Sequence, residues 1–172
     1  VAVIGLLLRR SHMVRALEAA GARVRRTSTD RYGNTLEASL WTVLLAVPAP
    51  LLVWYSAIVL QRLPAPSDWR YGLISGLTTA AWLLLAAAFV SEVMRPQGLA
   101  AAHLEWRQER LDRLRAAVRA LAAVYLPALV LTLSCVFGEA SEYFSSLGRV
   151  SFMLAHLWMA FVVYRLLFFA DG

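Results

Sequence analysis

The chain has 172 residues, of which 60% are hydrophobic and only 16% are charged, and its mean hydropathy is +0.60. Soluble domains carry about 25% charged residues, so this composition excludes an ordinary soluble protein. The net charge of +6 would favour nucleic acid in a soluble chain, but here it lies beside apolar segments. We therefore expect membrane lipids as partners and no nucleic acid.

Five apolar segments predict an all-α, polytopic membrane protein. Residues 1–8 are too short to cross a bilayer and precede two arginines, which predicts the cytoplasmic end of a truncated helix. We therefore expect residues 1–172 to be a single transmembrane module from a longer chain. The complete spans would measure roughly 33 to 39 Å as helices, against a hydrocarbon core of about 30 Å. They are predicted at residues 36–61, 71–94, 116–137 and 148–169.

The arginines predict the orientation of these spans. Seven arginines lie between residues 9 and 31 and six between 95 and 119, whereas the other two connections together hold three. Because basic residues near helix ends stay in the cytoplasm, loops 9–35 and 95–115 are expected inside. The arginines expected at the inner leaflet are Arg9, Arg10, Arg23, Arg25, Arg26, Arg107, Arg110 and Arg113.

Prolines predict bends in two of the spans. Pro48 and Pro50 lie within span 36–61, and Pro127 lies within span 116–137. Proline lacks the backbone N–H and clashes with the carbonyl four residues earlier, so a helix bends where it occurs. Each bend is either a functional hinge or a shape fitted to neighbouring helices, and the sequence leaves both open.

Small residues predict a packing face on span 71–94. Gly72, Gly76 and Ala80 recur every four residues, which places them on one side where another helix can approach closely. Cys135 is the single cysteine, so it cannot form an intramolecular disulfide, and we expect it to be buried as a small apolar residue.

The charged residues near the expected cytoplasmic ends of the spans do not indicate a catalytic or metal-binding site. Glu92 lies close to the end of its span, so we expect its carboxylate to reach water. Residues 99–121 have amphipathic spacing, which fits either a helix on the inner leaflet or an extension of the following span. We find no metal-binding or catalytic spacing, and expect neither an enzyme nor a cofactor.

Two short motifs resemble a known family. The first contains Arg95, Pro96, Gly98, His103 and Trp106, and the second contains Leu147, Gly148, Arg149 and Phe152. Together with the proline-bearing helices, they resemble the inner-membrane domain of large MscS-type mechanosensitive channels, the MscK (KefA) group. The resemblance covers most of the chain from about residue 30 to residue 167.

The resemblance implies a peripheral, lipid-facing membrane domain that responds to tension during osmotic protection. It also implies a multi-pass protein of the bacterial inner membrane that forms a homo-oligomer through a pore domain outside this sequence. Two alternatives remain from the residues alone. One is a fragment of a secondary transporter or permease, although no charged residue marks the membrane midplane. The other is the membrane anchor of a sensor protein.

Overall fold

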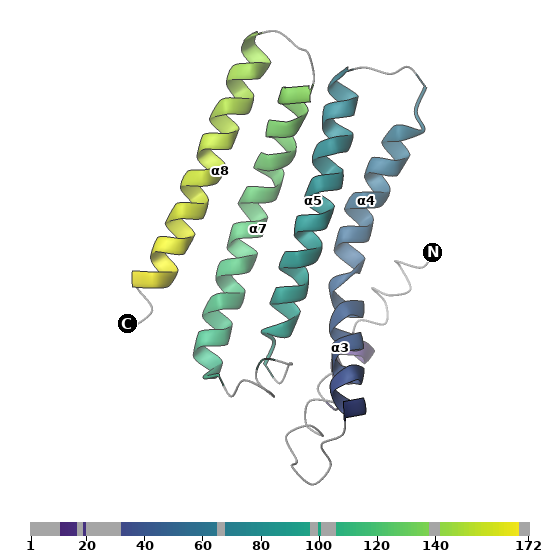
Figure 1. The fold of residues 1–172 in the computed structure, drawn as a ribbon, viewed down its shortest axis with the longest axis vertical. Coiled ribbons are helices and arrows are strands. Elements are labelled where there is room, and N and C mark those ends of the chain that lie inside the picture. The colour runs from purple at the N-terminus through teal and green to yellow at the C-terminus, as the bar shows by residue number, and fades with distance from the viewer. Residues whose placement is uncertain are drawn as a thin grey trace. The chain divides into compact units, whose positions relative to one another are not determined.

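The structure, a computed structural model, describes residues 11–16, 19, 32–64, 68–96, 100, 106–137 and 142–168. Within these ranges, every regular element longer than a turn is an α-helix, which confirms the all-α prediction. The labelled helices in Figure 1 are α3 (Tyr32–Ala46), α4 (Pro48–Gln61), α5 (Asp68–Val93), α7 (Gln108–Phe137) and α8 (Glu142–Phe168). The truncated helix expected at residues 1–8 lies outside the described residues.

Three helices are long and apolar enough to cross a membrane. They are α5, α7 and residues Ser146–Phe168 of α8. Residues Leu36–Ala46 and Pro48–Gln61 make a fourth span if the bent pair is counted as one. The chain is therefore a polytopic membrane protein, as predicted, with three or four spans among the residues that the structure describes.

The break between α3 and α4 falls at Val47, directly before Pro48. The two helices are bent by 43° there, although the backbone N–H of Val47 still donates to the carbonyl of Val43 at 3.1 Å. Pro48 and Pro50 lie in the first turn of α4. Proline is favoured at the start of a helix because the first N–H groups have no partner within it. The prolines therefore begin a new helix at this point, and the bend is the result.

α7 extends over 30 residues and continues without interruption through Pro127. Its first residues, from Gln108, belong to the amphipathic segment of the sequence, so this part is an extension of the span. Leu111 in this extension is fully buried, with 0% of its surface exposed. Burial of this leucine accounts for the amphipathic spacing, because one side of the extension is packed while its charged residues are exposed.

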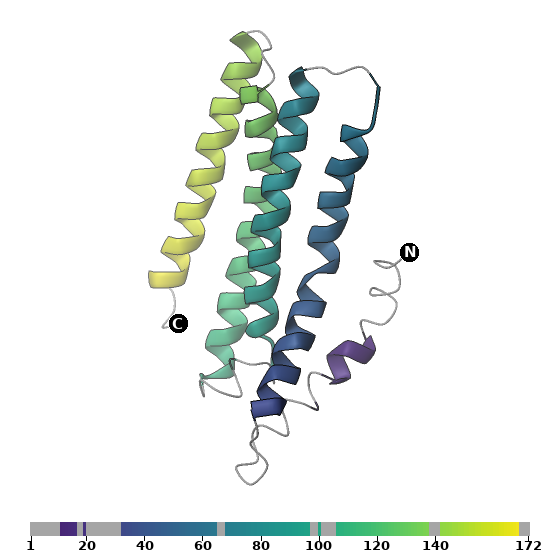
Figure 2. The same cartoon turned by 45° about the vertical axis from the view of Figure 1, so that its right-hand side comes forward.

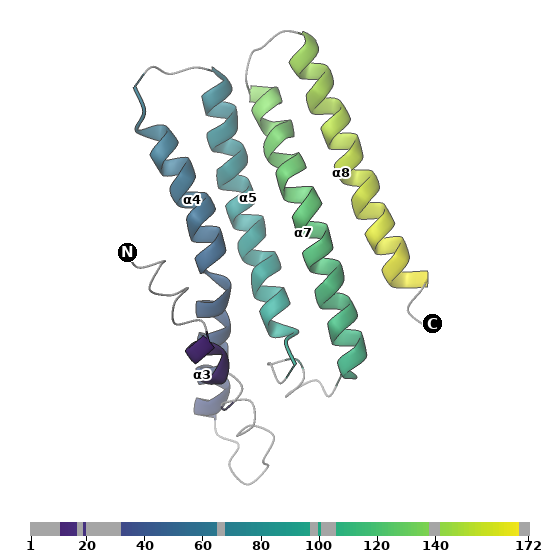
Figure 3. The same ribbon diagram turned by 180° about the vertical axis from the view of Figure 1, so that it is seen from behind.

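The described chain divides into two compact units. The first unit comprises Val1–Pro48 and Leu85–Arg119, and the second comprises Ala49–Leu84 and Ala120–Gly172. In the first unit, Met13, Ala38 and Leu45 form a small apolar core. In the second unit, α5 lies beside α7, and α7 lies between α5 and α8, as Figures 1, 2 and 3 agree.

Small side chains make the interior of both units. The buried apolar residues are mostly alanines, whereas many large apolar side chains point outward. Lipid tails solvate leucine and phenylalanine as well as a protein core does, so helices in membranes associate through close packing of small residues. The small apolar side chains buried in the described residues are those of Ala38, Ala46, Ala57, Ala80, Ala81, Ala100, Cys135 and Ala155.

Candidate functional site

The outer face of α8 is apolar over most of its length. Only 17% of the residues in the most apolar stretch of α8 are buried, and the buried share is the same in α5 and α7. A surface of this kind cannot face water, so it faces lipid. The large exposed side chains of α8 are Leu147, Val150, Phe152, Met153, Leu154, Leu157, Phe161, Val163, Tyr164, Leu167 and Phe168.

Polar contacts to backbone carbonyls hold α8 against α7 in the second unit. The Ser151 hydroxyl donates to the carbonyl of Ala128 at 2.9 Å, and the Trp158 indole Nε1 donates to the carbonyl of Ala120 at 3.0 Å. These two acceptors are eight residues apart, so the contacts lie about 12 Å apart along α7. The two helices are therefore fixed together at separate levels.

Glycine brings the backbones of α5 and α7 together in the second unit. A Cβ atom added to Gly72 would lie 2.7 Å from the carbonyl oxygen of Ser134, and one added to Gly76 would lie 2.9 Å from that of Val130. Both distances are shorter than van der Waals contact, so only glycine fits. Ala80, the third member of the predicted face, is also buried.

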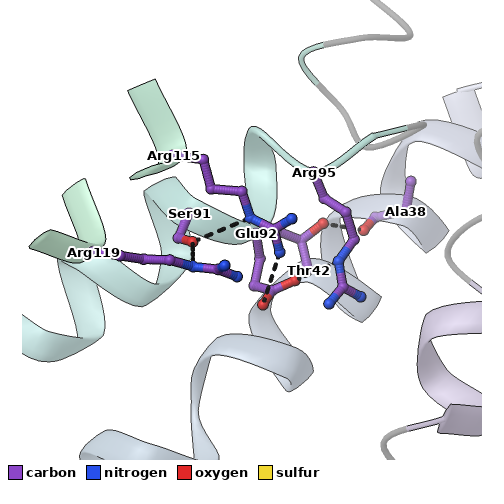
Figure 4. Close-up of polar contacts among 7 residues, drawn as sticks. All are labelled: Ala38, Thr42, Ser91, Glu92, Arg95, Arg115 and Arg119. Atoms are coloured by element: carbon purple, nitrogen blue, oxygen red, sulfur yellow. Dashed lines mark hydrogen bonds and ion pairs between the residues drawn. The ribbon is translucent and has the colours of Figure 1, made fainter. Parts of the chain in front are cut away.

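The first unit contains a buried ion-pair cluster at the end of α5 (Figure 4). Glu92 is only 5% exposed, and its Oε2 lies 3.1 Å from Nε of Arg95. Its Oε1 lies 3.9 Å from a terminal guanidinium nitrogen of Arg115 on α7. The expectation that the Glu92 carboxylate reaches water is therefore wrong. The reason is the α7 extension, which places an arginine over the end of α5.

Ser91 joins a second arginine to this cluster. Its hydroxyl oxygen accepts hydrogen bonds from Nε of Arg115 at 3.4 Å and from Nε of Arg119 at 3.2 Å. Arg115 and Arg119 lie four residues apart, on the same face of α7. Figure 4 shows both guanidinium groups converging on the end of α5.

The sequence analysis did not assign these residues to a site. Arg95 had been singled out for its family-like motif, but Ser91, Arg115 and Arg119 had not. A signal was available, since Glu92 and Arg95 are spaced i, i+3 and the two later arginines are spaced i, i+4. What the sequence could not show is that the two pairs face each other.

The two family-like motifs belong to different units of the structure. Pro96 and Trp106 are exposed, whereas Gly98 and His103 lie outside the described residues. On α8, Leu147, Arg149 and Phe152 are exposed. Gly148 is buried, and a Cβ atom added to it would lie 2.9 Å from Cβ of Cys135, which is itself buried as expected.

The structure describes three of the eight arginines that were predicted at the inner leaflet. Arg107, Arg110 and Arg113 are exposed near the start of α7. The remaining five, Arg9, Arg10, Arg23, Arg25 and Arg26, lie outside the described residues. Within the ranges that the structure describes, no group of three or more His, Cys, Asp and Glu side chains could hold a metal ion.

Apolar, lipid-facing helices with a closely packed interior define a polytopic membrane domain. The whole chain, residues 1–172, matches the family of the mechanosensitive ion channel inner membrane domain 1, and it belongs to this family. The resemblance to MscS-type channels is thereby confirmed. The family is one of ion channels and not of enzymes, and it places the chain in the bacterial inner membrane.

The chain is similar to the miniconductance mechanosensitive channel MscM of Escherichia coli (strain K12). The two are 28% identical over 145 residues, which make up 84% of this chain but 13% of that protein. The chain therefore spans a small part of the length of this relative. No solved structure matches it.

Proposed function

We propose that this chain is the peripheral, lipid-facing module of a mechanosensitive channel, which responds to membrane tension and protects the cell from osmotic stress. The observation that carries the proposal is the apolar outer face of α8. Large apolar side chains are exposed along the length of α8, and α8 is fixed to α7 by hydrogen bonds to the backbone of α7. A force on the lipid-facing helix is thus passed to its neighbour.

Tension can shift a closed-to-open equilibrium only through a difference between the two states. Helices that change tilt or exposed area against lipid provide such a difference, because mismatch with the bilayer costs free energy. The family membership favours this mechanism over a transporter fragment or a sensor anchor. The bend before Pro48 is, in this proposal, a point where the tilt of α4 changes.

The proposal includes parts beyond this chain. The related channel MscM is much longer, since the matched region makes up 13% of it. We propose that conduction belongs to a pore domain outside these residues and that the protein assembles as a homo-oligomer through that domain. The residues described here would then lie at the periphery, in contact with lipid.

Patch-clamp recording tests the proposed function directly. The full-length protein, expressed in cells without other mechanosensitive channels, is expected to open under stepwise suction. Replacing Leu154 and Leu157 with serine should raise the tension needed for opening, since these side chains are 60% and 64% exposed on the lipid-facing side of α8. Ala160→Ser is the control on the same helix, because it removes no large apolar contact. Silence at near-lytic tension would reject the channel function.

The predicted orientation also has a direct test. With Cys135 replaced by alanine, a cysteine at position 108 should resist a membrane-impermeant thiol reagent in intact cells, whereas one at position 67 should be labelled. Gln108 is exposed at the start of α7, so protection there reflects its side of the membrane and not burial. Labelling at 108 without labelling at 67 would reverse the orientation.

A further inference from the structure

The ion-pair cluster of the first unit carries more positive than negative charge. Its positive groups are the guanidinium groups of Arg95, Arg115 and Arg119. Its buried negative group is the carboxylate of Glu92, and the nearby carboxylate of Asp112 is exposed on the surface of α7. The side chains of Arg95 and Arg115 are only 13% and 14% exposed, so water solvates them poorly. Two poorly solvated guanidinium groups thus share one buried carboxylate, with the exposed Arg119 beside them, and this excess of positive charge favours a bound anion.

Several hydrogen-bond donors of the cluster have no acceptor among the described residues. The Ser91 hydroxyl accepts two hydrogen bonds from arginines, and in the described part of the chain its own hydrogen has no acceptor. Arg119 is exposed, and its terminal nitrogens have no acceptor among these residues, so a ligand can reach them from outside. Nη1 of Arg95 is buried without a hydrogen-bond partner. The unfilled donors of Ser91 and Arg95 are buried, which costs free energy, and a ligand that accepts a hydrogen bond from a buried donor removes this cost.

We infer that Arg115, Arg119 and Ser91 form a binding site for a phosphate group. Two neighbouring guanidinium groups and a hydroxyl supply the hydrogen-bond donors that a tetrahedral oxyanion accepts, and arginine binds phosphate through several oxygens at once. The site lies where the apolar part of α5 ends, next to Val93. A phosphate at this depth comes either from the headgroup of an anionic phospholipid or from free phosphate in solution. Glu92 holds Arg115 in place beside the site.

Lipid binding to the purified full-length protein tests this site without requiring channel activity. The protein in detergent is titrated with phosphatidylglycerol, or with diacylglycerol, which lacks the phosphate, and bound lipid is counted by native mass spectrometry. The variant Arg115→Gln/Arg119→Gln should bind phosphatidylglycerol about tenfold more weakly, as expected for the loss of charge-assisted hydrogen bonds. The matched control is Arg110→Gln/Arg113→Gln, which removes the same charge from exposed positions of the same helix.

Two milder variants keep the test valid if the double variant does not fold. Ser91→Ala leaves every charge in place, and Arg119→Gln does not touch the ion pair between Glu92 and Arg115. Each should weaken binding about threefold. Displacement of the lipid by inorganic phosphate would identify free phosphate as a ligand, and failure to displace it would identify the headgroup. Equal affinity in all variants, an equal loss in the control variant, or equal binding of diacylglycerol would each overturn the site.

Discussion

Replacing Glu92 with alanine is expected to destabilise the protein by about 3 kcal/mol or more, the cost of breaking a buried ion pair from one side. The carboxylate is 5% exposed and faces Arg95 at 3.1 Å and Arg115 at 3.9 Å. Its removal leaves two guanidinium groups in a poorly solvated position without their common counter-charge. Denaturant titration of the purified full-length protein in detergent micelles measures the loss as a change in the free energy of unfolding.

Two further variants separate this effect from a general loss of charge. Replacing Glu92 with leucine and both Arg95 and Arg115 with methionine should recover most of the stability, because apolar side chains of similar size do not need a counter-charge. Glu109→Ala breaks the pair of Glu109 and Arg107, whose side chains are 72% and 74% exposed, and should have no measurable effect. If Glu92→Ala were as harmless as Glu109→Ala, the carboxylate would be solvated after all.

Replacing Gly76 with leucine is expected to separate α5 from α7 and to cost at least about 2 kcal/mol of stability. Even a methyl group at this position would lie 2.9 Å from the carbonyl oxygen and 3.0 Å from the Cα atom of Val130. Both are backbone atoms, so no change of side-chain rotamer relieves the clash. The loss should appear in the same denaturant titration, accompanied by a lower yield of monodisperse protein.

Ala86→Leu is the control for this substitution. Ala86 also lies on α5 but is exposed, so added bulk there extends into lipid or detergent. This variant should keep the stability of the unaltered protein, because the added side chain contacts detergent both before and after unfolding within a micelle. Equal stability of Gly76→Leu and Ala86→Leu would show that α5 and α7 are not in close contact at Gly76.

The sequence by itself determined the class of the protein. Long apolar segments can lie only in a membrane, and inside a membrane each must form a helix to satisfy its own backbone hydrogen bonds. The spacing of Gly72, Gly76 and Ala80 indicated a packing face for the same reason, since a helix places every fourth residue on one side. These properties depend on neighbours along the chain, so no tertiary structure was needed.

The tertiary structure decided which elements meet. The position of Glu92 near a helix end suggested a solvated carboxylate, but the extension of α7 brings Arg115 over it. Whether residues 108–119 lie on the leaflet or prolong the span was open in the sequence, because both arrangements use the same amphipathic pattern. Burial of Leu111 accompanies the second arrangement. Contacts between residues more than 20 positions apart depend on helix packing, which neither composition nor periodicity specifies.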